Sequence, residues 1–230
     1  MGRRYKISIW TRLQICYNNR SDCIAKTRLS LMADRRPPRY LRPTFEKLDT
    51  FELAIVRRQV MLRSLPLIAR IANGANLLGD GWLYPMLAIL VAALFGREAL
   101  RPVVFAVLSV ALGHLTYPLI KLHIARSRPA SKDQALSVRP PLDWYSCPSG
   151  HTMTATAAFL PLGFAFPALG VCLLPIWIML GWTRLILGHH YPSDLIAGAV
   201  LGAIWVALNA LILMPFVDGS KVFMALTSPA

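Results

Sequence analysis

The sequence predicts an all-α, polytopic transmembrane helical bundle of about five spans, preceded by an N-terminal amphipathic interfacial helix. Of the 230 residues, 55% are hydrophobic and only 16% are charged, whereas soluble domains are about 45–50% apolar and about 25% charged. The mean hydropathy is +0.48. This composition excludes a disordered chain and a coiled coil, and the four scattered cysteines argue against a disulfide scaffold or a structural zinc site.

The chain is strongly basic. Lys and Arg number 25 against 11 Asp and Glu, which gives a formal net charge of +14. A basic protein of this size can bind nucleic acid, but duplex-binding proteins lack apolar runs long enough to cross a bilayer. We therefore expect membrane lipids, and no nucleic acid, as partners. The sequence leaves the oligomeric state open.

The basic residues gather before position 79. Residues 1–78 hold 16 of the 25 Lys and Arg and contain no uncharged apolar stretch of the about 20 residues that a spanning helix needs. We predict a basic, disordered tail over residues 1–50, within which Met32 is an alternative start of translation to Met1. Apolar residues recur at helical spacing over 51–78, which predicts a helix lying on the bilayer surface.

Apolar segments of the kind that cross a membrane begin near residue 79. They predict a membrane-embedded domain over residues 79–217 and a short tail over 218–230. Only Pro167 separates the third segment from the fourth, which favours a tight helical hairpin. The five expected spans are Trp82–Phe95, Pro102–Leu122, His151–Phe166, Ala168–Leu187 and Leu195–Phe216.

Three polar clusters stand at the ends of these spans: Lys121–Pro129, Cys147–Thr152 and Thr183–Asp194. The second span ends at the first cluster and the third span begins at the second cluster. The fourth and fifth spans meet in the third cluster. Five spans therefore place all three clusters on the same side of the membrane.

The clusters bring fixed positive charges to one interface. Lys121, Arg128 and Arg184 would repel one another there unless an anion lies between them. Arg offers a planar fork for two phosphate oxygens, and Lys offers a point charge. Ser149 and Gly150 stand where a helix begins, so that backbone N–H groups and the helix dipole also favour an anion.

Two histidines complete the predicted pocket, His151 and His190. Asp194 follows His190 by four residues, across a proline that is expected to start the last helix. An Asp in that first turn can accept a hydrogen bond from one imidazole nitrogen, which leaves the other as a nucleophile or a base. The residues predict a phosphate pocket with two imidazoles.

The order and spacing of these residues resemble a known signature. The pattern K-x6-R-P, then P-S-G-H, then S-R-x5-H-x3-D is similar to that of the type 2 phosphatidic acid phosphatase superfamily, which includes membrane lipid phosphatases and vanadium haloperoxidases. The resemblance covers roughly residues 70–215. One position departs from it, because Thr183 stands where the pattern has Ser. The neighbouring His189 is excluded by the spacing in favour of His190.

The resemblance implies a metal-independent phosphatase without a cofactor, which acts through a phosphohistidine on His190. By the same resemblance, Asp194 orients His190, and His151 acts as general acid and then as general base. The residues implied to hold phosphate are Lys121, Arg128, Ser149, Gly150 and Arg184. The implied substrate is a lipid phosphate or diphosphate of the undecaprenyl diphosphate, phosphatidic acid or phosphatidylglycerol phosphate type.

Two other functions stay open at this point. A vanadate-dependent haloperoxidase has the same ligand set, but members of that group are soluble. A non-catalytic membrane protein that binds an anion is the second alternative, although inactive relatives usually lose one of the histidines or the aspartate. Asp80, between two glycines, is interpreted as the cap of the first span.

The charge distribution and the family resemblance predict opposite membrane faces for the site. With five spans, one side of the membrane holds the N-terminal segment and the polar clusters, and with them 22 of the 25 Lys and Arg. Cytoplasmic segments of membrane proteins carry such an excess. The charge count thus predicts a cell (inner) membrane protein whose site faces the cytoplasm and whose C-terminus faces outward. The habit of bacterial relatives is a periplasmic site.

Overall fold

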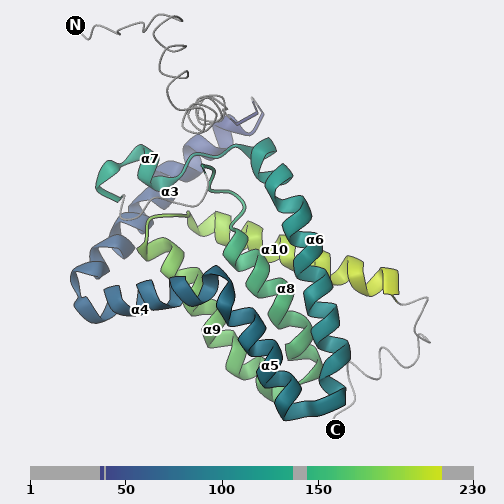
Figure 1. The fold of residues 1–230 in the computed structure, drawn as a ribbon. Coiled ribbons are helices and arrows are strands. Elements are labelled where there is room, and N and C mark those ends of the chain that lie inside the picture. The colour runs from purple at the N-terminus through teal and green to yellow at the C-terminus, as the bar shows by residue number, and fades with distance from the viewer. Residues whose placement is uncertain (1–36, 39, 137–143, 214–230) are drawn as a thin grey trace, which may run out of the picture. The chain divides into compact units, whose positions relative to one another are not determined.

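The computed structural model describes residues 37–38, 40–136 and 144–213, which belong to one compact unit that begins at Pro37 (Figure 1). Every regular element in these residues is helical, as the sequence predicts. The elements are α3 (Arg42–Met61), η1 (Leu62–Ser64), α4 (Pro66–Leu77), η2 (Leu78–Trp82), α5 (Leu83–Phe95), η3 (Gly96–Ala99), α6 (Leu100–Ile124), α7 (Pro129–Lys132), η4 (Gln134–Leu136), α8 (Gly150–Ala165), α9 (Pro167–Ile186) and α10 (Pro192–Leu213). Of the disordered tail expected over residues 1–50, residues 1–36 lie outside the described residues, and residues 42–50 are not disordered but belong to α3. The tail expected over 218–230 also lies outside the described residues.

The expected interfacial helix is two helices in the structure. The first, α3, already begins at Arg42 with a proline in its first turn. It is separated from α4 at Leu65, whose extended backbone (φ −83°, ψ 114°) is imposed by the proline that follows. The buried residues of α3 include Asp49 and Glu52. This helix therefore turns acidic side chains, and not only apolar ones, towards the rest of the unit.

The membrane-embedded helices follow the expected spans closely. In the described part of the chain, three helical stretches are long and apolar enough to cross a membrane: Pro66–Ile124, Pro167–Ile186 and Pro192–Ile212. The first of these includes α4, α5 and α6. Because α5 has 13 residues and α8 has 16, each is shorter than a full span. The number of five spans stays a prediction.

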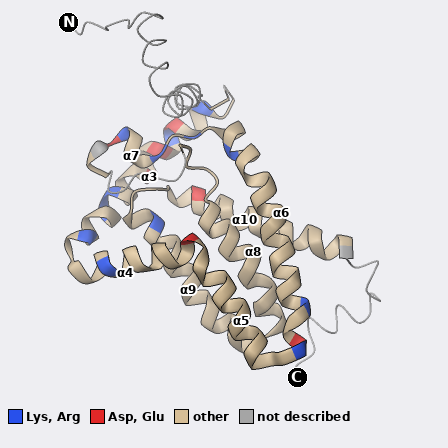
Figure 2. Cartoon of the chain, in the orientation of Figure 1, with Lys and Arg blue, Asp and Glu red and all other residues tan. Residues whose placement is uncertain are grey.

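The surface of these helices suits a lipid environment. Large apolar side chains such as Ile89, Leu115 and Val171 are exposed on α5, α6 and α9. Figure 2 shows that charged residues lie mainly on α3 and α7, at the helix ends near them and at the turn between α5 and α6, whereas the middle parts of the long helices are almost free of charge. An apolar surface of this extent is typical of a protein that contacts membrane lipids.

The core is built around α8. This helix packs against α6, α9 and α10, and ten of its residues are buried. Helix α10 approaches it closely through Gly198 and Gly202, because a Cβ at Gly198 would overlap the carbonyl oxygen of Ser149, just before α8, and one at Gly202 would overlap that of Met153. Small residues spaced four apart are a common device for close helix packing in membranes. The close packing fixes the start of α8 next to the start of α10.

The ends of four helices meet at one place. The backbone N–H of Ser149, just before α8, donates to the Asp194 carbonyl in the first turn of α10 at 2.9 Å. The N–H of Ser146 donates to the carbonyl of Arg126, just after α6, also at 2.9 Å. The end of α9 joins them, since α9 and α10 are linked by only five residues. The expected convergence of the three polar clusters is present in the structure.

Candidate active site

The three predicted cations are buried together at this convergence. Lys121 lies in the last turn of α6, Arg128 directly before α7, and Arg184 in the last turn of α9. Their exposed fractions are 5%, 5% and 2%. All three lie near enough to His190 to act on its charge, as does His151. The structure thus gathers the predicted cations and both predicted histidines in one site.

The site contains buried polar groups that lack a protein partner. Within the described part of the chain, nothing accepts a hydrogen bond from Nε or Nη2 of Arg184, and the hydroxyl of Ser149 has no partner. Buried polar groups are nearly always hydrogen-bonded, and leaving one unsatisfied costs about 1–3 kcal/mol. Ser149 also directly precedes Gly150, the first residue of α8, where helix N–H groups favour an anion. Donor groups of this kind can hydrogen-bond to a negatively charged ligand.

His190 is held in a single tautomer. Its Nδ1–H donates to the carbonyl oxygen of Ser146 at 2.7 Å, and since a carbonyl only accepts, the proton is on Nδ1. Nε2 therefore carries the lone pair, and it lies 3.5 Å from Nη1 of Arg128. Burial, together with the positive charges of Arg128, Lys121 and Arg184, lowers the pKa of His190 well below its usual range. The lowered pKa favours the neutral form of the ring, in which Nε2 carries the lone pair.

The structure corrects the expected hydrogen bond between His190 and Asp194. The Nδ1 atom of His190 lies 3.8 Å from Oδ2 of Asp194, which is too long for a hydrogen bond. The Asp194 carboxylate has other donors: Nη1 of Arg126 at 2.6 Å and the N–H of Tyr191 at 2.8 Å. Asp194 thus secures the loop that carries His190, and a backbone carbonyl selects the tautomer.

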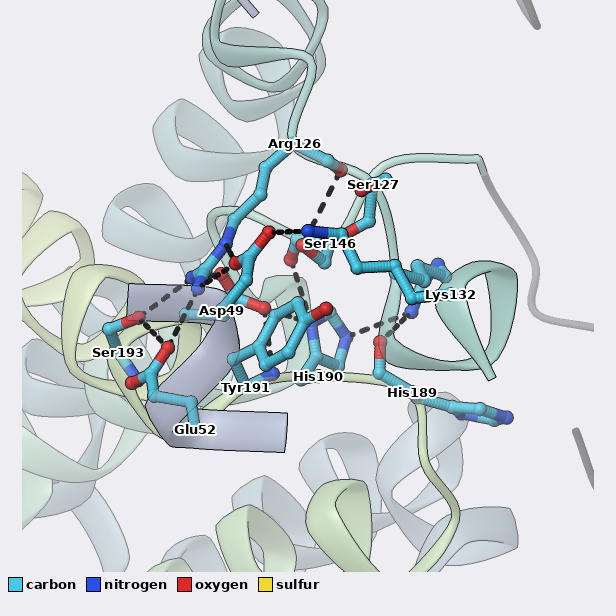
Figure 3. A network of polar contacts seen from close by, with 12 residues as sticks. Asp49, Glu52, Arg126, Ser127, Lys132, Ser146, His189, His190, Tyr191 and Ser193 are labelled. Atoms are coloured by element: carbon cyan, nitrogen blue, oxygen red, sulfur yellow. Dashed lines mark hydrogen bonds and ion pairs between the residues drawn. The ribbon is translucent and has the colours of Figure 1, made fainter. Parts of the chain in front are cut away.

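Arg126 is the centre of a buried ion cluster that the sequence analysis missed (Figure 3). It is 1% exposed and donates to Asp49 at 2.6 and 2.9 Å and to Glu52 at 2.7 Å. Its guanidinium lies 4.1 Å from the ring centroid of Tyr191. Burial opposes the charge of Arg126, but Asp194, Glu52 and Asp49 outweigh it and raise its pKa.

The same cluster attaches α3 to the beginning of α10. Glu52 accepts hydrogen bonds from the N–H and the hydroxyl of Ser193, both at 2.8 Å. Asp49 also pairs with Lys132 of α7. A signal for this role was present in the sequence, because Asp49 and Glu52 are three residues apart and so share one helix face. Their partner Arg126 gives no such signal, since it lies about 75 residues away.

His151 has a carboxylate partner from outside the signature. Its Nε2 lies 2.7 Å from Oδ1 of Asp80 in η2. The position of Asp80 between two glycines predicts a cap of the first span, but neither η2 nor α5 has a side-chain cap hydrogen bond. The carboxylate instead faces the site.

The fold and the site together define a class: an all-helical membrane protein with a buried, cation-lined site. The chain belongs to the PAP2 superfamily, whose family model matches residues 102–217. This confirms the resemblance found in the sequence.

Several relatives are lipid phosphatases. The chain is 36% identical to lipid A 1-phosphatase of Rhizobium johnstonii over 109 residues, which are 45% of each protein, so the match spans less than half of that relative. It is 34% identical to decaprenylphosphoryl-5-phosphoribose phosphatase of Mycobacterium tuberculosis over 75% of this chain and 89% of that one. Undecaprenyl-diphosphatase BcrC of Bacillus subtilis is 29% identical over 57% of this chain and 70% of its own.

Solved structures share the fold. The crystal structure of Aquifex aeolicus LpxE aligns with a TM-score of 0.60 at 23% identity, over 70% of this chain and 95% of that one. The transmembrane PAP2-type phosphatidylglycerolphosphate phosphatase of Bacillus subtilis aligns with a TM-score of 0.58 at 22% identity, over 78% and 96%. At this level of sequence identity, both structural similarities show a shared fold and no more.

Proposed function

We propose that this protein is an integral membrane phosphatase that hydrolyses a lipid phosphate or diphosphate through a phosphohistidine intermediate. The observation that carries the proposal is a set of buried groups without a partner among the described residues, Nε and Nη2 of Arg184 and the hydroxyl of Ser149. They belong to the same site as His190, whose pKa is lowered by burial and by the neighbouring cations. A phosphoryl group has oxygens for these donors and a phosphorus atom for the imidazole. The lipid phosphatases among the relatives support hydrolysis of a lipid phosphate.

In the first step, Nε2 of His190 attacks phosphorus in line with the departing lipid oxygen. The P–N bond forms as the P–O bond breaks, and His151 gives a proton to the leaving oxygen. The phosphoryl oxygens are held by Lys121, Arg128 and Arg184 together with Ser149 and the N–H of Gly150. These groups stabilise the charge that the transition state spreads over the equatorial oxygens.

In the second step, water replaces the histidine. His151, now neutral, accepts a proton from the water as its oxygen bonds to phosphorus and the P–N bond breaks. Inorganic phosphate leaves, and His190 and His151 return to their starting protonation states. Asp194 keeps the His190 loop in place during both steps through its bonds to Arg126 and the Tyr191 N–H.

Phosphate release by the full-length protein in detergent tests the proposal. The substrates are phosphatidic acid, phosphatidylglycerol phosphate and undecaprenyl diphosphate. We expect turnover of at least one of them, unchanged by EDTA because the positive charge of the site comes from side chains, and inhibited by vanadate as a transition-state mimic. Halide oxidation by the vanadate-loaded protein would favour the haloperoxidase alternative. Vanadate binding with neither activity would favour an anion-binding membrane protein.

We also propose that the protein lies in the cell (inner) membrane with its site facing the cytoplasm. The support is the charge asymmetry, in which 22 of the 25 Lys and Arg lie on the side of the site when five spans are assumed. Alkaline phosphatase and green fluorescent protein fused after Ala230 distinguish the faces. Alkaline phosphatase activity is the expected result, and a fluorescent cytoplasmic fusion would contradict it.

A further inference from the structure

Asp80 approaches the candidate site from a part of the chain that the family model does not include. It lies in η2, between α4 and α5, whereas the family match begins at residue 102. It is separated from His151 by 71 positions in the sequence. Its contact with His151 is therefore produced by the packing of α4 and η2 against α8 and α9 and not by the signature.

Both oxygens of the Asp80 carboxylate are engaged. Oδ1 accepts the Nε2–H of His151 at 2.7 Å, and Oδ2 accepts the side-chain N–H of Asn76 at 2.8 Å. Asn76 is one turn earlier and is itself buried. A length of 2.7 Å is in the range of charge-assisted hydrogen bonds. Asn76 thus fixes one side of the carboxylate and leaves the other side aimed at the imidazole.

The backbone around Asp80 is shaped for this approach. A Cβ at Gly79 would lie 2.9 Å from Cδ2 of Leu180 and 3.4 Å from Cδ2 of His151, so a larger residue would push η2 away from α8 and α9. Gly81 has a φ of +145°, which residues with a Cβ rarely adopt. The two glycines that suggested a helix cap therefore bring a carboxylate to the site.

The charges around His151 show how the Asp80 carboxylate affects the protonation of its ring. Arg184 of α9 and Lys121 of α6 act on the imidazole with positive charge, and His151 in turn acts on the charge of His190. These groups disfavour a second proton on His151. Among the described residues that act on its charge, Asp80 is the acidic one.

We propose that Asp80 is a positioning residue for His151: its carboxylate holds Nε2–H and stabilises the protonated ring, so that Nδ1 delivers the proton to the departing oxygen. This inference rests on the proposed phosphatase function. As the P–O bond breaks, the proton moves from Nδ1 to the leaving oxygen, and the ring stays neutral with Nε2–H on Asp80. In the second step, Nδ1 takes a proton from the attacking water.

The test compares Asp80→Asn with wild-type protein on two substrates that need different amounts of proton transfer. A lipid phosphate has a poor leaving group, whereas p-nitrophenyl phosphate has a good one. General acid catalysis contributes about 10²–10⁴-fold, so we expect kcat for the lipid to fall about 100-fold and kcat for p-nitrophenyl phosphate to fall less than about 5-fold. The basic limb of the kcat profile for the lipid should move to lower pH, and Asp80→Glu should restore part of the activity.

Two further variants separate positioning from structure. In a His151→Ala background, Asp80→Asn should cause no additional loss, because the two residues act as one unit. Asp133→Asn, which alters an exposed pair with Arg57, should behave as wild type. Vanadate affinity within about 3-fold of wild type shows that Asp80→Asn keeps the folded site.

The outcomes distinguish the inference from the proposed function. Equal losses on both substrates, losses that add to those of His151→Ala, or full activity of Asp80→Asn would each overturn the role of Asp80 and leave the phosphatase intact. A wild-type protein that turns over neither substrate would overturn the proposed function, and the role of Asp80 with it.

Discussion

The two histidines of the site are paired with carboxylates in opposite ways. Asp80 bonds directly to His151 at 2.7 Å and is partly exposed. Asp194 is fully buried and lies 3.8 Å from His190. Its carboxylate is instead bonded to Arg126 and to the backbone. One carboxylate thus acts on a ring, whereas the other acts on the loop that holds a ring.

This difference suits the two proposed roles. A nucleophile must be neutral and must present a lone pair, and a carbonyl on Nδ1 provides both without attracting a second proton. A general acid must hold a proton until the leaving group departs, and an adjacent carboxylate favours the protonated ring. The contrast predicts that removal of His190 has the largest effect on turnover. Changes to the ion cluster that holds its loop are expected to act mainly through the stability of the protein.

His190→Ala should abolish turnover, with a loss of about 10⁴-fold or more because the covalent route is removed. The adjacent His189→Ala is the matched control and should keep turnover within a few-fold. Acid-sensitive phosphoprotein in rapidly quenched reactions, assigned to a residue by mass spectrometry, is the measurement. Phosphate found on His151 or on His189 would contradict the assignment of His190 as the nucleophile.

Arg126→Gln tests whether the ion cluster around Asp194 holds the loop that carries His190, with the stability of the protein as the measured quantity. The change leaves Asp49, Glu52 and Asp194 buried without their shared cation, and breaking a buried ion cluster in this way costs about 3–5 kcal/mol. A large fall in Tm of the detergent-solubilised protein is expected, partly reversed by adding Asp49→Asn and Glu52→Gln. Arg57→Gln, in an exposed pair, should change Tm little. Equal Tm values for the two arginine variants would show that the cluster does not hold the loop.

Arg184→Ala removes the guanidinium whose Nε and Nη2 have no hydrogen-bond partner among the described residues and which carries the proposed function. Loss of one preorganised donor to a developing oxyanion typically costs about 10²–10³-fold in kcat, and vanadate affinity should fall as well. Arg70→Ala, on the exposed side of α4, is the control for charge alone. If vanadate affinity and kcat survive the loss of Arg184, the anion lies elsewhere.

The sequence was sufficient for the parts that depend on local pattern. The apolar segments predicted α6, α9 and α10 to within a few residues, and the spacing of Lys121, Arg128 and Arg184 predicted cations that the fold does gather. The interfacial segment was less well predicted, because Pro66 breaks it and α3 starts before residue 51.

The contacts that were missed are all long-range. Asp80 between two glycines has the same pattern as a helix cap, and only its packing against α8 reveals another role. Arg126 lies inside the K-x6-R-P pattern at a variable position, and its partners on α3 are 74 and 77 positions away. No periodicity connects residues that far apart, so a buried ion cluster of this kind becomes visible only in the folded chain.

The smallest expected effect concerns pH and tests whether His190 is neutral in the folded protein. Its pKa is lowered by burial and by the nearby cations, so between that lowered value and about 6.5 the unfolded chain binds a proton that the folded chain does not. Stability from this group is fully present above about pH 6.5 and is lost as the pH falls, by up to about 1.4 kcal/mol per pH unit. Wild-type protein should therefore lose more Tm than His190→Gln between pH 7.5 and 5.5, since the other titrating groups are common to both. Parallel Tm curves would mean that His190 keeps an ordinary pKa, and the contrast between a neutral nucleophile and a protonated acid would lose its basis.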